Sequence, residues 1–201
     1  MFVETRNSLI GTLRYFTWRP DASSYFHGTG AAFARSLLAY VLAFPFSMAI
    51  AYWDTDLQTR SRLDTFGWAV YVIEAIAGIA IVLGIAFLAA RLMGRREHFF
   101  RYGAAANWQA FFATSIAFAL FGIDEATSWF AREDAVGTAA TALGVLVVTA
   151  LLYWSWAILH QALKLRWWQS LPLALVLAVV SLIVASIARV TVKIGSAPTV
   201  G

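Results

Sequence analysis

The sequence predicts an all-α membrane protein, an antiparallel bundle of five transmembrane helices preceded by a short interfacial amphipathic helix. Composition is the first observation: 61% of the 201 residues are hydrophobic and 13% are charged, whereas soluble domains carry about 25% charged residues. Five long apolar runs are the second observation. The third is the absence of cysteine, which excludes disulfide frameworks and cysteine-ligated metal centres.

Residues 1–35 are expected to form a cytoplasmic amphipathic segment. Its helix is predicted over Ser8–Trp18, because apolar side chains recur there at i, i+4 and i+7 while arginines take other positions. Arg19 precedes Pro20, and the residue before a proline is disfavoured in helical conformation. This helix either lies flat in the membrane surface or packs under the bundle as an ordinary lead-in. The side chains expected to face acyl chains are Leu9, Leu13 and Phe16.

Five apolar runs of 18 to 25 residues follow, long enough to cross about 30 Å of hydrocarbon as helices. They make up a transmembrane domain, residues 36–189, and leave a short external tail, residues 190–201. Short links between the runs require neighbouring helices to be antiparallel. The predicted spans are about 36–53, 66–90, 102–123, 135–159 and 167–188.

Basic residues predict the orientation, because cytoplasmic links of membrane proteins are enriched in Lys and Arg. One side of the predicted bundle holds ten of them: Arg6, Arg14, Arg19, Arg35, Arg91, Arg95, Arg96, Arg101, Lys164 and Arg166. The other side holds five: Arg60, Arg62, Arg132, Arg189 and Lys193. The N-terminus is therefore expected in the cytoplasm and the C-terminus outside. The basic excess is a collar that attracts anionic lipid headgroups, and no nucleic-acid partner is expected.

Glu74 is the only formal charge within the predicted spans, and it lies near mid-membrane, where an unpaired carboxylate is costly. Tyr71 could donate a hydrogen bond to it from one turn away, and Ala77 and Gly78 would let a neighbouring helix approach. Two hypotheses stay open. Glu74 is a neutral group that hydrogen-bonds between helices, or it is a proton- or ion-responsive site in an oligomeric transporter or channel subunit. Hydroxyl groups predicted near that depth belong to Ser47, Ser115, Thr149 and Ser181.

Asn107 and Gln109 are the polar residues of the third predicted span. Residues two apart do not share a helix face, so these two side chains are not expected to form one site. Asn107 is expected to point inward, because Gly103 precedes it by one turn and opens that face. Structural hydrogen bonding and ligand binding both remain open for Asn107.

The link between the second and third spans, Met93–Tyr102, is basic and aromatic. Gly94 is suited to end a helix, and the turn after it would place arginines at lipid phosphates and aromatic rings in the interface. The alternative is a plain cytoplasmic loop. Together with N-terminal arginines, the residues expected to contact anionic lipid or a partner are Arg14, Arg19, Arg95, Arg96, Phe99, Phe100 and Arg101.

No sequence motif indicates catalysis. The three histidines, His27, His98 and His160, all lie away from mid-membrane, so haem ligation within the bilayer is not expected. The sequence contains no Gly-rich phosphate loop, HExxH zinc motif or GxSxG nucleophile motif. The chain is therefore expected not to be an enzyme and to hold neither a metal nor a cofactor.

An amphipathic Arg-Pro segment ahead of five spans, with a Gly-basic-Phe turn before a polar third span, resembles the bacterial branch of the Yip1-domain family. The matching positions are Gly94, Phe99, Phe100, Tyr102 and Asn107. The resemblance implies a topology and a bacterial inner membrane location, without a mechanism. The expected function is a non-catalytic, membrane-organising or accessory subunit, whose partners are the lipid bilayer and other membrane subunits or further copies of itself.

Overall fold

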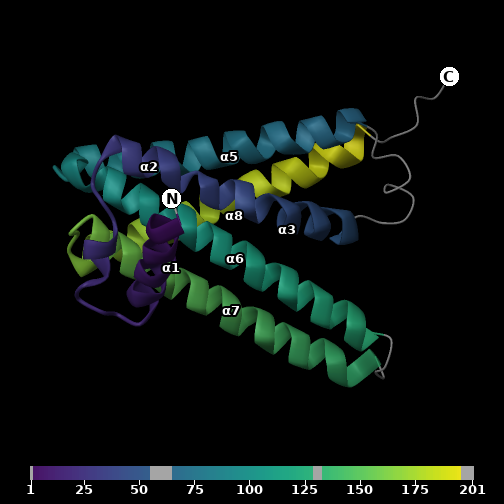
Figure 1. Ribbon diagram of the computed structural model, residues 1–201. Coiled ribbons are helices and arrows are strands. Elements are labelled where there is room, and N and C mark those ends of the chain that lie inside the picture. The colour runs from purple at the N-terminus through teal and green to yellow at the C-terminus, as the bar shows by residue number, and fades with distance from the viewer. Residues whose placement is uncertain (1, 55–64, 129–132, 196–201) are drawn as a thin grey trace.

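The chain folds into helices throughout the residues that the computed structural model describes, which are 2–54, 65–128 and 133–195. The α-helices are α1 (Phe2–Phe16), α2 (Gly30–Ser36), α3 (Leu38–Asp54), α5 (Thr65–Leu92), α6 (Phe99–Ser128), α7 (Glu133–Ala162) and α8 (Trp167–Gly195). Two 3-10 turns, η1 (Ala22–Tyr25) and η2 (Arg96–His98), lie in the links. Figure 1 shows the arrangement.

Five segments are long and apolar enough to cross a membrane: Gly30–Tyr52, Trp68–Leu92, Arg96–Ile123, Ala142–Ala162 and Trp167–Val184. Helices α6 and α7 have 30 residues each, which corresponds to about 45 Å at 1.5 Å per residue. They are longer than about 30 Å of hydrocarbon requires, so their ends extend into the interfacial layers. The predicted fold class, a five-helix membrane bundle with a short helix before it, is confirmed.

The long helices run up and down in alternation and form two groups. Helix α3 packs on α6, α5 on α8, α6 on α7, and α7 on α8. Figure 1 shows that α3, α5 and α8 diverge from α6 and α7 toward the end of the molecule at which α8 ends. All five spans come together at the opposite end, where α1 crosses the bundle.

The first span begins earlier than the apolar run indicates. The hydroxyl oxygen of Thr29 accepts a hydrogen bond from the Ala32 N–H, and such a cap satisfies a donor that a helix start leaves free. Helix α2 therefore begins at Gly30 and carries Arg35 within it. The predicted and observed starts of the first span differ because a polar capping residue can begin a helix before the apolar run starts.

Small residues set two of the closest approaches between elements. A Cβ atom built on Gly78 of α5 would lie 2.7 Å from Val184 Cγ1 of α8, and one on Gly103 of α6 would lie 2.6 Å from Phe33 Cε2 of α2. Glycine lets helices come this close in membranes. The expected approach at Gly78 is confirmed, whereas Ala77 lies on the exposed side of α5.

Candidate functional site

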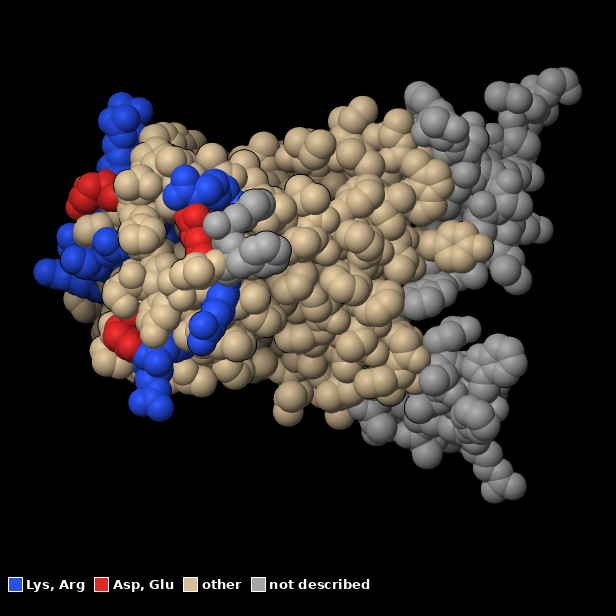
Figure 2. Space-filling model, viewed as in Figure 1, with Lys and Arg blue, Asp and Glu red and all other residues tan. Residues whose placement is uncertain are grey.

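Charged side chains gather at the end of the molecule where α1 lies. Figure 2 shows Lys, Arg, Asp and Glu at this end and an uncharged surface over the middle of the bundle. The basic residues come from α1 and the link after it, from α2, from the α5–α6 link with η2, from the start of α6, and from the α7–α8 link. We call this region the basic end, and its arginines include Arg14, Arg19, Arg95, Arg96 and Arg101.

Helix α1 is attached to the basic end through a small and polar face. Ser8, Thr12 and Tyr15 are buried on this face, and the indole N–H of Trp154 donates a hydrogen bond of 2.9 Å to the carbonyl of Thr12. A Cβ atom on Gly11 would lie 2.5 Å from Tyr25 Cβ. The helix is thereby held tightly against α7 and η1.

The predicted apolar stripe of α1 lies only partly outside this attachment, because Leu9 packs against the core. Leu13 is 48% exposed and Phe16 is 38% exposed, and Leu9 is half-buried. The Phe16 ring still contacts Trp154, with 5.2 Å between ring centroids. Helix α1 also begins and ends earlier than predicted, at Phe2 and Phe16. It therefore packs on the bundle by one face and keeps apolar side chains exposed on another.

An aromatic stack fixes the end of the N-terminal segment. Trp18 adopts a positive φ of 55° and stacks on Trp156 at 4.9 Å and on His160 at 5.4 Å between centroids. The hydrophobic pattern of the sequence does not predict this cluster. Its only sequence signal is the i, i+4 spacing of Trp156 and His160 on α7, which puts both rings on one helix face.

The buried Tyr15 of α1 lies close to the half-buried Arg101 of α6. Neither the Tyr15 hydroxyl nor Arg101 Nε has a hydrogen-bond partner among the described residues. Burial raises the pKa of the Tyr15 hydroxyl, and the positive charge of Arg101 opposes this shift. Arg101 is half-buried, so it is less available to a lipid headgroup than the exposed Arg96.

The basic-aromatic link forms a hollow of about 650 Å³ lined by Gly28, Phe87, Arg96, Glu97, Phe99 and Phe100. The guanidinium of Arg96 lies 6.0 Å from the Phe87 ring centre. Phe100 is 40% exposed, but Phe99 is only 7% exposed, because its ring packs against Phe87 at 5.1 Å between centroids. The Phe99 ring is therefore covered mainly by the protein, and its contact with a lipid or a partner stays a prediction.

Asn107 and Gln109 connect α6 to different neighbours, as the sequence indicates. Asn107 is fully buried, and its Nδ2 donates a 2.8 Å hydrogen bond to the Ser36 hydroxyl. Its Oδ1 has no partner among the described residues. Gln109 donates to the Ser155 hydroxyl of α7 at 2.8 Å. The face opened by Gly103 is filled by the ring of Phe33.

Glu74 and Tyr71 do not form the expected pair. The Tyr71 hydroxyl donates to the Ser47 carbonyl of α3 at 3.3 Å, and Glu74 Oε2 is buried without a hydrogen-bond partner in the described part of the chain. Helical side chains lean toward the N-terminus. Tyr71 precedes Glu74, so its hydroxyl reaches away from the carboxylate and toward the neighbouring helix.

The hydroxyl groups predicted near the depth of Glu74 are all used within their own helices. Each donates to the carbonyl four residues earlier, at 2.8 to 3.3 Å: Ser47, Ser115, Thr149 and Ser181. Ser and Thr often satisfy themselves in this way inside helices. These groups therefore do not converge on Glu74.

The described residues contain no group of three or more His, Cys, Asp or Glu side chains that could hold a metal ion. The chemistry that the basic end offers is anion and headgroup recognition by guanidinium groups beside aromatic rings. No family model, curated protein or solved structure matches the chain. The resemblance to the Yip1-domain family therefore stays a prediction.

Proposed function

We propose that this multi-pass membrane protein is a non-catalytic, membrane-organising or accessory subunit of the bacterial inner membrane. Its N-terminus is in the cytoplasm, its C-terminus is in the periplasm, and its basic end binds anionic lipid headgroups. The protein acts together with other membrane subunits or with further copies of itself. A Yip1-like topology is part of the same proposal.

One observation carries the proposal: the described spans have no continuous polar lining. Among the described residues, the buried polar side chains lie near the basic end: Ser8, Thr12, Ser36, Asn107 and Ser170. Deeper hydroxyls donate to their own helices. A pathway for ions or polar substrates needs polar groups along its length, whereas a protein that organises lipid and neighbouring helices needs an apolar surface in the bilayer.

The arginines of η2 and its flanks support a headgroup role. Arg96 is exposed and lines the same hollow as the exposed ring of Phe100, and the neighbouring Arg95 is half-buried. Each basic residue near an anionic membrane surface contributes about 1 kcal/mol. We expect the purified protein to bind phosphatidylglycerol, and Arg95→Gln combined with Arg96→Gln to weaken this binding about thirtyfold. Arg166→Gln, an exposed arginine stacked on Trp168, is the matched control.

Native mass spectrometry in mild detergent measures this binding. Equal affinity for phosphatidylglycerol and for phosphatidylcholine of the same chain length would contradict the headgroup role. Reporter fusions after Arg60 and after Arg132 should be periplasmic, and a fusion after Arg96 cytoplasmic. The reverse pattern would overturn the orientation.

A transporter or channel subunit is the second candidate, and the buried, unpartnered Oε2 of Glu74 favours it. The test is proton flux into liposomes under an imposed pH gradient, with wild type compared with Glu74→Gln. We expect no flux from either protein. A wild-type flux that Glu74→Gln removes, with folding unchanged, would replace our proposal by the transporter.

A further inference from the structure

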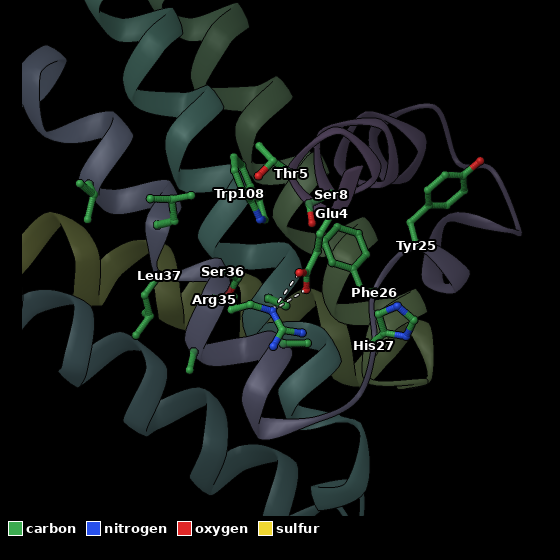
Figure 3. A pocket seen from close by; sticks show the side chains of 15 residues that line it. Glu4, Thr5, Ser8, Tyr25, Phe26, His27, Arg35, Ser36, Leu37 and Trp108 are labelled. Atoms are coloured by element: carbon green, nitrogen blue, oxygen red, sulfur yellow. Dashed lines mark hydrogen bonds and ion pairs between the residues drawn. The ribbon is translucent and has the colours of Figure 1, made fainter. Parts of the chain in front are cut away.

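A cavity of about 500 Å³ lies between α1, α2, the start of α3 and α6, apart from the hollow at η2. Figure 3 shows that side chains from these elements surround it, with Glu4 and Ser8 from α1 facing Arg35 from α2. One part of its lining is polar and includes Glu4, Ser8, His27 and Arg35. The other part is apolar and includes Val41 and Trp108.

Opposite charges meet at the rim of this cavity. Arg35 Nε donates to both carboxylate oxygens of Glu4, at 2.9 Å each. The side chains are 54% and 36% exposed, so both charges remain accessible. Among the described residues, the two Nη groups of Arg35 make no hydrogen bond. The rim therefore places the Nη donors of Arg35 next to the carboxylate of Glu4, and both groups can reach a bound molecule.

The apolar lining leads from this rim into the first span. Leu37 follows α2 directly, and Leu38 and Val41 lie on α3. Val41, six residues further on, lies about 9 Å along the helix direction and is 66% exposed. A molecule with its polar group at Arg35 would therefore place its hydrocarbon on α3, in the direction of the bilayer interior.

We propose that this cavity binds one phospholipid whose headgroup contains a phosphate and a primary ammonium, as in phosphatidylethanolamine. The phosphate accepts hydrogen bonds from Arg35 Nη groups, the ammonium donates to the Glu4 carboxylate, and an acyl chain lies on Leu37 and Val41. The site deepens the proposed membrane-organising function and rests on it for its position at the bilayer surface.

Charge and hydrogen bonding select this headgroup over others. A purely anionic headgroup meets the Glu4 carboxylate beside the arginine, and like charges disfavour it. A choline headgroup has no N–H donor for Glu4 and cannot make a charge-assisted hydrogen bond. Near η2, by contrast, arginines outnumber acidic residues, which suits anionic lipids. The two regions of the basic end therefore differ in headgroup preference.

Native mass spectrometry of the full chain, titrated with phosphatidylethanolamine, phosphatidylcholine and phosphatidylglycerol of identical acyl chains, tests the proposal. We expect one phosphatidylethanolamine to bind about tenfold more tightly than phosphatidylcholine, and Glu4→Gln to remove this preference. Glu97→Gln, an exposed glutamate at the same end, is the matched control and should leave the preference intact.

Val41→Trp gives a second variant that keeps the Glu4–Arg35 ion pair. The larger side chain would occupy the apolar wall and lower phosphatidylethanolamine affinity without changing the melting temperature. The proposal is overturned if wild type shows no preference for this lipid, or if Glu4→Gln behaves like Glu97→Gln. Loss of phosphatidylglycerol binding alone would remove the anionic-lipid part of the proposed function and leave this site standing.

Discussion

Replacement of Gly78 by alanine should separate α5 from α8. The added Cβ would lie 2.7 Å from Val184 Cγ1 and 3.9 Å from Val184 Cβ, whereas carbon atoms in contact prefer about 3.5–4.0 Å. Valine has a single strongly preferred rotamer in a helix, so Val184 cannot easily turn aside. The contact is relieved mainly by moving one helix backbone away from the other.

Two opposing effects determine how much Gly78→Ala changes the free energy of unfolding. Inserting one carbon into a tight contact costs about 1–3 kcal/mol, and replacing glycine by alanine in a helix interior favours folding by up to about 1 kcal/mol. Gly84 lies on the same helix with nothing within 4 Å of its built Cβ, so Gly84→Ala shows the second term alone. We expect Gly78→Ala to be about 2 kcal/mol less stable than Gly84→Ala.

Reversible unfolding in mixed detergent–SDS micelles, followed by the fluorescence of the nine tryptophans, measures both variants. Val184→Ala removes the contacted Cγ1, so the double variant with Gly78→Ala should recover about 1 kcal/mol of coupling energy. Stabilities of Gly78→Ala and Gly84→Ala that agree within about 0.5 kcal/mol, or an absence of coupling to Val184, would refute the reasoning.

Three further changes test the attachment of α1 and the interior of α6. Trp154→Phe removes the hydrogen bond to Thr12, costs about 1 kcal/mol, and should speed trypsin cleavage of the N-terminal segment, whereas Tyr153→Phe should not. Tyr15→Phe should be more stable than wild type above about pH 10. Burial raises the pKa of Tyr15, so the unfolded chain releases a proton that the folded chain keeps, and the stability of the wild type falls as pH rises. Parallel plots of unfolding free energy against pH for the two proteins, from about pH 9 to 11, would contradict this. Asn107→Ala should cost about 1 kcal/mol in the same unfolding assay, and an unchanged stability would show that its hydrogen bond is dispensable.

The sequence predicts the spans well because the bilayer leaves few alternatives. An apolar run in hydrocarbon must satisfy its backbone internally, so length and composition are enough to indicate a helix. The close approach of a helix at Gly78, and the different neighbours of Asn107 and Gln109, were predictable for a related reason. Helix geometry fixes which residues share a face before any tertiary contact is known.

Contacts made by side chains of low hydrophobicity could not be predicted in this way. The face by which α1 attaches is made of Ser8, Gly11, Thr12 and Tyr15, which no hydrophobic pattern distinguishes. The acceptor of Tyr71 lies on another helix, and the ion pair between Glu4 and Arg35 joins residues 31 apart. Pairings of this kind depend on how the links fold, and local sequence does not specify them.

The position of the protein core at the basic end has a physical cause. Inside hydrocarbon, lipid chains solvate apolar side chains as well as protein does, so there is no hydrophobic force to close the helices on one another. At the end where the chain meets water, apolar groups must be covered by the protein itself. The fully buried side chains Ile158 and Leu159 near the end of α7, and Leu163 just after it, belong to the core at that end, where α1 packs on α7. The short N-terminal helix is therefore a cover for the core, and weakening its attachment should loosen the basic end before it affects the spans.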